Sequence, residues 1–138
     1  MKIFLGGTCA DSTWREALIP MLNIDYYNPV VKDWTAECQA EEIKQREECD
    51  FVLYTITPSM IGVYSIAEVI DDSNKRPEKT IFCLLGTCGD KAFLHSQWMS
   101  LLAVSNMVVE NGGYSFLSLE SVASFVNYGF RFTKSEIK

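Results

Sequence analysis

The feature that most constrains the fold is an almost continuous apolar run at residues 51–56, FVLYTI, which Thr57 and Pro58 bring to an end. Apolar runs rich in β-branched and aromatic residues are typical of strands buried on both faces of a parallel sheet. After a loop containing Gly62, residues 63–72 carry apolar side chains at 63, 66, 67 and 70, which is a helical spacing. The stretch therefore predicts a strand, a loop and a helix, and ligands of parallel α/β sheets bind at such loops.

The rest of the chain predicts the same alternation of strands and helices. The predicted strands are residues 2–5, 24–27, 51–56, 80–85 and 114–117. The predicted helices are residues 13–20, 35–49, 63–72, 92–110 and 118–128. This pattern indicates an α/β fold with one doubly wound, flavodoxin-like or Rossmann-like parallel sheet of order 2-1-3-4-5 and helices on both faces. For 138 residues we expect a single domain, 1–138.

Composition excludes several classes of protein. With 48% hydrophobic and 22% charged residues the chain has the profile of an ordinary globular protein, so we expect no membrane contact. The net charge of -6 provides no basic surface for duplex nucleic acid. Residues 1–7 are too short for the apolar core of a signal peptide.

Cysteine and histidine usage argues against disulfides and metals. The five cysteines include no C-x-x-C pair, and His95 is the single histidine. Neither a disulfide framework nor a metal site follows from these spacings, so we expect a reducing, cytoplasmic location and no metal or other cofactor.

Two glycines, Gly6 and Gly7, follow the first predicted strand, and Thr8 comes next. Glycines at that position let backbone N–H groups approach a ligand closely, although a plain turn has the same composition. Ser12 and Arg15 open the following helix, and Arg15 adds a positive charge suited to phosphate, unless it is simply a surface arginine. The P-loop pattern is absent.

Two motifs carry a family resemblance: GGT ends the first strand, and GVYSIAEV follows the central strand. Over residues 1–85 the chain resembles the nucleoside 2-deoxyribosyltransferase-like family and its relatives that hydrolyse nucleotide N-glycosidic bonds. The resemblance implies that Glu68 is the nucleophile that attacks the anomeric carbon. By pattern alone, Glu68 falls with Tyr64, Asp71 and Asp72 opposite the apolar stripe, which predicts a solvated helix face.

The segment NPVVKDWT after the second strand resembles the corresponding loop of the same family. The resemblance implies that Asn28, Asp33 and Trp34 line the pocket, where the indole offers a flat face to a base or sugar, whereas simple packing is the other reading of the tryptophan. It also places Glu42 where the transferases have an aspartate that contacts the base and assists proton transfer, and Asp33 is the alternative acid. By pattern alone Glu42 is a carboxylate on a helix surface.

The start of the catalytic helix both matches the family and departs from it. Tyr64 and Ser65 are placed to orient the nucleophile or to bind substrate oxygens. Gly62 stands where the known transferases carry an aspartate, six residues before the nucleophile. Glu68 therefore favours an enzyme that cleaves or transfers the N-glycosidic bond of a (deoxy)ribonucleoside or its 5′-monophosphate. Gly62 favours the alternative, a module that binds a nucleotide or nucleotide-derived signal without turnover.

The C-terminal half is richer in large apolar residues than one end of a small sheet requires. These residues are Trp98, Met99, Leu101, Leu102, Met107, Phe116, Phe125, Tyr128, Phe130 and Phe132. Exposed surplus of this kind is typical of a subunit interface, and the resemblance implies a homo-oligomer in which a neighbour completes each pocket. We expect a homodimer or higher oligomer, with residues 95–106 at the contact.

Overall fold

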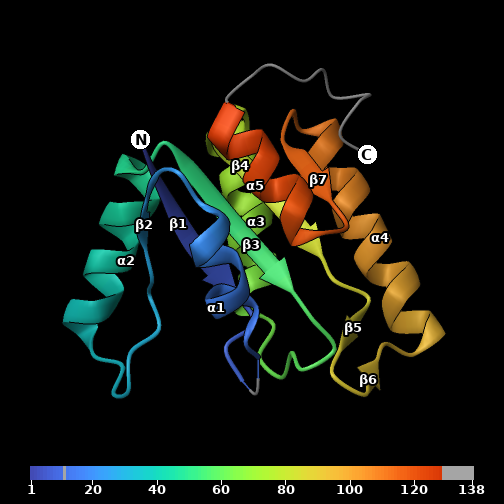
Figure 1. The fold of residues 1–138 in the computed structure, drawn as a ribbon. Coiled ribbons are helices and arrows are strands. Elements are labelled where there is room, and N and C mark those ends of the chain that lie inside the picture. The colour runs from blue at the N-terminus through green and yellow to red at the C-terminus, as the bar shows by residue number, and fades with distance from the viewer. Residues whose placement is uncertain (11, 129–138) are drawn as a thin grey trace.

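A computed structural model describes residues 1–10 and 12–128. Its main sheet has five strands in the order β2-β1-β3-β4-β7, and all neighbouring pairs are parallel (Figure 1). The strands of this sheet are β1 (Lys2–Gly7), β2 (Asp25–Tyr27), β3 (Phe51–Ile56), β4 (Thr80–Leu84) and β7 (Tyr114–Phe116). The predicted doubly wound α/β sheet and its flavodoxin-like order are confirmed.

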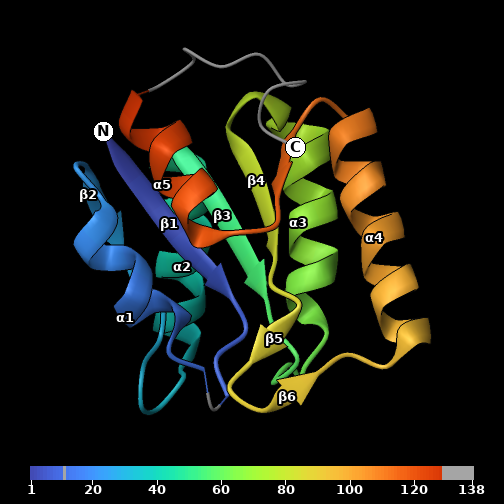
Figure 2. The same ribbon diagram turned by 45° about the vertical axis from the view of Figure 1, so that its right-hand side comes forward.

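Helices cover both faces of the sheet. They are α1 (Trp14–Leu18), α2 (Ala36–Glu48), α3 (Tyr64–Lys75), α4 (His95–Glu110) and α5 (Leu119–Tyr128), with short 3-10 turns η1 (Ile19–Met21) and η2 (Pro77–Lys79). The face toward the viewer in Figure 1 carries α1 and α5, and the opposite face carries α2, α3 and α4 (Figure 2). None of the helices in the described ranges is long and apolar enough to cross a bilayer.

The central strand β3 explains the continuous apolar run. All six of its residues are buried, because β3 lies between β1 and β4 with helices on both sides. Phe51 and Leu53 pack into the core under α1 and α5, whereas Val52, Tyr54 and Ile56 pack into the core under α3 and α4. A strand in this position has no solvent-facing side, so its sequence shows no polar alternation.

The structure differs most from the predicted elements in three places. Residues 86–91 were expected as a loop but include a two-residue antiparallel pairing between β5 (Thr87–Cys88) and β6 (Lys91–Ala92), which is too short to produce a periodic pattern. Helix α4 begins at His95, later than the predicted residue 92, because the backbone N–H of Leu94 donates to the Gln97 side chain at 2.9 Å and caps the helix there. Helix α3 continues to Lys75, three residues beyond the predicted end at Asp72.

The carboxyl ends of β1 and β3 are joined side by side, which creates the switch point of the sheet. The backbone N–H of Thr8 donates to the carbonyl oxygen of Thr55 at 2.9 Å, and that of Thr57 donates to the Thr8 hydroxyl at 3.0 Å. Gly7 makes this approach possible, since its φ is +115° and a Cβ there would lie 2.1 Å from the Thr55 carbonyl oxygen. After β1 the chain turns to α1, and after β3 it turns to α3 on the other face.

We expect Gly7→Ala to lower the free energy of unfolding by more than about 2 kcal/mol, because it adds both an unfavourable φ and a steric clash with β3. Gly62→Ala is the matched control, since a Cβ at Gly62 meets no atom within 4 Å. Its effect should stay within about 1 kcal/mol of zero. Equilibrium urea unfolding measures both, and equal stability of the two variants would contradict the close approach of β1 and β3.

Candidate functional site

A hollow of about 240 Å³ lies at the switch point, between the loop after β1 and the start of α3. It is lined by Gly7, Thr8, Cys9, Ala10, Met60, Ile61, Gly62, Tyr64 and Ser65. The structure thus brings together five of the predicted binding residues from two segments about fifty positions apart in sequence. Gly6 precedes them as a buried residue of β1.

The mouth of the hollow is apolar. Ile61 is 82% exposed and Tyr64 is 66% exposed, although both are large hydrophobic side chains. Exposed apolar groups beside a concave site are suited to the flat face of a base or to the carbon face of a sugar. Gly62 leaves room for the ligand itself, since a Cβ there would meet no atom within 4 Å.

Glu68 lies one helical turn beyond the hollow. It follows Ser65 by three positions and Tyr64 by four, so all three share one side of α3. Its side chain is only 14% exposed, and the Asp72 side chain on the next turn is fully buried. The prediction of a solvated helix face was therefore wrong for Glu68 and Asp72, because Arg46 of α2 pairs with both. Tyr64 of the same face is exposed, and the Asp71 side chain is 44% exposed.

Arg46 is a functional candidate that the sequence pattern did not single out. Its guanidinium lies 3.4 Å from a Glu68 carboxylate oxygen through Nη1. Its Nε and Nη2 donate to the two oxygens of Asp72 at 3.1 and 3.0 Å. A signal was present in the sequence: Glu42 and Arg46 are four residues apart on α2, and Glu68 and Asp72 are four apart on α3.

Both candidate carboxyl groups have raised proton affinity. Burial raises the pKa of Glu68 to about 7, against the charge of Arg46, with Glu42 and Asp72 adding to the rise. Burial also raises the pKa of Glu42, while a hydrogen bond from Trp34 and the charge of Arg46 act in the opposite direction. Two interacting carboxyl groups whose pKa values are both raised can divide the roles of nucleophile and proton donor.

The predicted site residues of the loop between β2 and α2 are exposed to solvent. Trp34 is 57% exposed and reaches Glu42 through its hydrogen bond. Asn28 and Asp33 are exposed, and the Asn28 side chain accepts a hydrogen bond from the Val30 N–H at 3.1 Å. Of this loop, Trp34 alone makes a described contact with a candidate catalytic carboxyl group.

Arg15 is turned inward and is only 5% exposed. Its guanidinium donates to the carbonyl oxygens of Leu5 at 3.0 Å and Thr8 at 2.7 Å, with a longer contact to Gly7. This arginine therefore braces the loop that lines the hollow, and the sequence analysis did not anticipate that role. Ser12 is outside the lining, and its buried hydroxyl has no hydrogen-bond partner within the described ranges.

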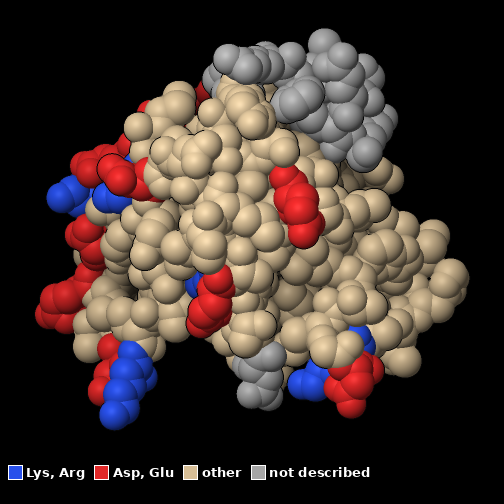
Figure 3. Space-filling view, in the orientation of Figure 1, with Lys and Arg blue, Asp and Glu red and all other residues tan. Residues whose placement is uncertain are grey.

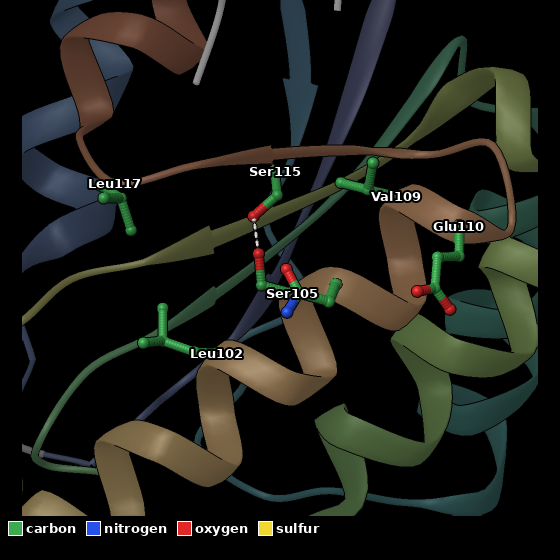
Figure 4. Close-up of a pocket in the computed structure, with 7 residues that line it drawn as sticks. Leu102, Ser105, Val109, Glu110, Ser115 and Leu117 are labelled. Carbon is green, nitrogen blue, oxygen red and sulfur yellow. Dashed lines mark hydrogen bonds between the residues drawn. The ribbon is translucent and has the colours of Figure 1, made fainter. Parts of the chain in front are cut away.

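A second hollow, of about 300 Å³, lies at the far edge of the sheet between α4 and β7 (Figure 4). Ser105 of α4 and Ser115 of β7 point toward each other across it, and Leu102, Val109 and Leu117 make most of its surface apolar. None of the predicted site residues lines this hollow. The described residues also contain no group of His, Cys, Asp and Glu arranged to hold a metal ion.

Comparison with known protein families gives one match. The family described as nucleoside 2-deoxyribosyltransferase like matches residues 1–85, which confirms the resemblance seen in the sequence motifs. This stretch runs from β1 through the end of β4 and contains the switch-point hollow, Glu42 and Glu68. Comparisons with curated proteins and with solved structures gave no match.

The raised pKa of Glu68 predicts a particular dependence of stability on pH. The folded state binds this proton more tightly than the unfolded state, so Glu68 lowers the free energy of unfolding as pH rises from about 4.5 to about 7. Glu68→Gln has no carboxyl group to titrate, so it does not lose this part of the free energy of unfolding as pH rises. Relative to the wild type, the variant should gain on the order of 2 kcal/mol across that interval and nothing further above it.

Thermal unfolding at a series of pH values measures this difference. Glu48→Gln is the control, because Glu48 has an exposed side chain on α2. A constant difference between Glu68→Gln and the wild type from pH 4.5 to 7 would contradict the burial of an ionisable Glu68.

Proposed function

We propose that this chain, which belongs to the nucleoside 2-deoxyribosyltransferase-like family, cleaves or transfers the N-glycosidic bond of a (deoxy)ribonucleoside or its 5′-monophosphate with Glu68 as the nucleophile. One observation carries the proposal. Glu68 is a mostly buried carboxyl group on the first turns of α3, one helical turn beyond the hollow at the switch point of the sheet, where α/β folds bind ligands.

A carboxylate suits this chemistry because positive charge develops at the sugar C1 as the bond to the base breaks. In the first step the Glu68 oxygen forms a bond to C1, and the electrons of the C1–N bond pass to the leaving base. The base takes a proton from Glu42, the neighbouring carboxyl group with raised pKa. Water or a second base then attacks C1 of the ester, gives up a proton to the Glu42 carboxylate and releases Glu68.

The alternative proton donor is Asp33, but two features favour Glu42. Its side chain is half-buried, which favours the protonated form, and it shares Arg46 with Glu68 through the electrostatic contacts of both groups. Asp33 is exposed on the loop before α2. Trp34, which is hydrogen-bonded to Glu42, would hold the Glu42 carboxyl group in place and offer its ring to the departing base.

The lining of the hollow would hold the sugar end of the substrate. Thr8, Tyr64 and Ser65 contribute polar groups, and the absence of a side chain at Gly7 lets backbone N–H groups approach the substrate. Arg15 contributes by fixing the loop, since its donors are engaged with the Leu5 and Thr8 carbonyls. Any effect of Arg15 on a 5′-phosphate would then act through loop geometry, whereas a direct contact would require the side chain to leave its buried position.

A binding module without turnover is the second candidate function, and one observation favours it. The space beside Gly62 is open, with no atom within 4 Å of a Cβ there, so this chain has no carboxylate where the known transferases place one. A site of this kind still has a hollow and an apolar rim for a nucleotide.

The deciding experiment incubates the protein with a panel of nucleosides and 5′-monophosphates, with and without a free acceptor base, and separates the products by chromatography. Release of base alone identifies a hydrolase, and exchange of bases identifies a transferase. Retention of intact ligand without product identifies a binder and overturns the enzymatic proposal.

If turnover occurs, Glu68→Ala should lower it by several powers of ten, because the covalent nucleophile is lost while a helix accepts alanine readily. In the wild type, kcat/KM should rise as pH approaches about 7 and Glu68 loses its proton. Glu48→Ala on the exposed side of α2 is the control. If Glu68→Ala kept more than about a tenth of wild-type activity, a roughly 1.4 kcal/mol effect, Glu68 would not be the nucleophile.

An oligomer is the assembly that the surface favours. Leu101, Phe116 and Phe125 prove to be core residues, but Met99 is 52% and Met107 is 49% exposed on α4. Phe130 and Phe132, also named in the sequence analysis, lie outside the described residues, as does the tail at 133–138. Charged side chains gather over α2 at the left of Figure 3 and are sparse toward α4, in which Glu110 is the only Asp, Glu, Lys or Arg.

A groove between α3 and α4 is mostly apolar, with Asp71 as the one charged residue of the described chain that lines it. It is lined by Val63, Ile66, Ala67, Ile70, Asp71, Asn74, Ser100, Leu101 and Val104. Because the groove begins at Val63, beside the mouth of the hollow, a second copy seated there would reach the site. This position agrees with the expected contact at residues 95–106.

We expect Ser100→Glu to shift the protein toward a single-chain mass, because a charge in an apolar interface is poorly solvated. Light scattering at micromolar concentration should give a multiple of 15.6 kDa for the wild type and for Gln39→Glu, which adds the same charge to the exposed side of α2. A wild-type mass near 15.6 kDa would show that each site is complete within one chain.

A further inference from the structure

The side of α3 that meets Arg46 of α2 holds a buried ion cluster, which we define as Arg46, Tyr54, Asp72 and Arg76. Asp72 is its centre, with a fully buried carboxylate. It accepts hydrogen bonds from Arg46, from Arg76 at 3.1 Å and from the hydroxyl of Tyr54, a fully buried residue of the central strand. Three side chains from three elements therefore fix one carboxylate.

Asp72 in turn fixes the plane of the Arg46 guanidinium. Two nitrogens of Arg46, Nε and Nη2, donate to the two Asp72 oxygens at 3.1 and 3.0 Å, which is the bidentate fork that orients an arginine most firmly. With these two nitrogens held, the third, Nη1, is aimed at Glu68 and lies 3.4 Å from its carboxylate oxygen. The Arg46 side chain is only 9% exposed, so solvent does little to loosen this arrangement.

Stability alone does not account for such a cluster. Burying several charges costs about as much as their attraction returns, and well-packed apolar residues would hold α2 against α3 as firmly. The third arm of Arg46 is also superfluous for joining the helices, since the fork to Asp72 already does so. What the third arm adds is a fixed cation at the candidate nucleophile.

We infer that Arg46 is a positioning residue that holds the Glu68 carboxylate toward the switch-point hollow, with Asp72, Tyr54 and Arg76 as its support. The inference rests on the proposed function for the role of Glu68 as nucleophile. The contact between Arg46 and Glu68 does not depend on that proposal. The charged and titratable groups that interact with Glu68 are Arg46 and Glu42 of α2, Asp72 of its own helix and Tyr54 of β3. Arg46 is the one cation described within ion-pair distance of it in residues 1–10 and 12–128.

The test follows the titration of Glu68 itself, by carbon-detected NMR of the side-chain carboxyl, whose signal is identified by its loss in Glu68→Gln. Arg46→Gln removes the charge and should raise the pKa of Glu68 by about one to three units. Arg46→Lys keeps a charge but cannot hold Asp72 and Glu68 through one planar fork. With any substrate that the wild type cleaves, Arg46→Lys should lower kcat about tenfold to a hundredfold while KM changes little.

Lys75→Gln is the matched control, since it removes one positive charge from α3 where the side chain is 62% exposed and pairs with Asp71. It should leave both the Glu68 titration and kcat unchanged. A cluster that merely ties α2 to α3 would lower the melting temperature of the Arg46 variants without moving either quantity, and that result overturns the inference. If Arg46→Gln does not fold, Arg46→Lys decides alone: a wild-type titration and a wild-type kcat together overturn the inference.

The two proposals fail in different ways. A protein that cleaves no nucleoside or nucleotide refutes the proposed function, but the Glu68 titration in the Arg46 variants still decides whether Arg46 positions it. Conversely, normal turnover and an unchanged Glu68 titration in both Arg46 variants would refute the positioning role of Arg46. The assignment of Glu68 as the nucleophile would still stand.

Discussion

The requirement to pair the buried carboxylate of Asp72 organises the half of the molecule that carries the site. Asp72 is fully buried on α3, and an unpaired charge there would cost several kcal/mol, so its partners must be in place when the chain folds. Those partners come from α2, from the central strand and from the end of α3 itself. Satisfying Asp72 therefore sets how α2 lies against α3, and this in turn decides which side chains can face Glu68.

A second set of contacts sets the other wall of the site. Thr8 bridges β1 and β3 through two hydrogen bonds, and Arg15 binds the carbonyl oxygens on either side of Gly7. The loop after β1 is thus held by backbone pairing and by one buried cation, rather than by an apolar core. Buried arginines serve both sets of contacts, Arg15 in the loop after β1 and Arg46 beside Glu68, and each arginine binds groups of the protein itself.

The main elements of the fold could be predicted because they depend on local patterns. The apolar run at residues 51–56 has no polar alternation, which is what a central strand requires, and Thr35 and Ser118 are found next to the helices they were expected to begin. The two-residue strands β5 and β6 are too short to show any periodicity. Asp72 was assigned to a solvated face because a helical wheel shows only one helix, whereas its partner Arg46 lies 26 residues away on another.

The way Arg46 divides its charge bears on how Glu68 could serve as a nucleophile. A cation committed fully to Glu68 would lower the pKa of that group well below neutral and leave a weakly basic carboxylate. Here the shorter contacts of Arg46 go to Asp72, and only the 3.4 Å contact goes to Glu68. Burial then dominates, and the pKa of Glu68 stays near 7. The same guanidinium can therefore orient the Glu68 carboxylate without removing the proton affinity that makes it reactive. Because Arg46 also pairs with Asp72, it can orient Glu68 without lowering its pKa far.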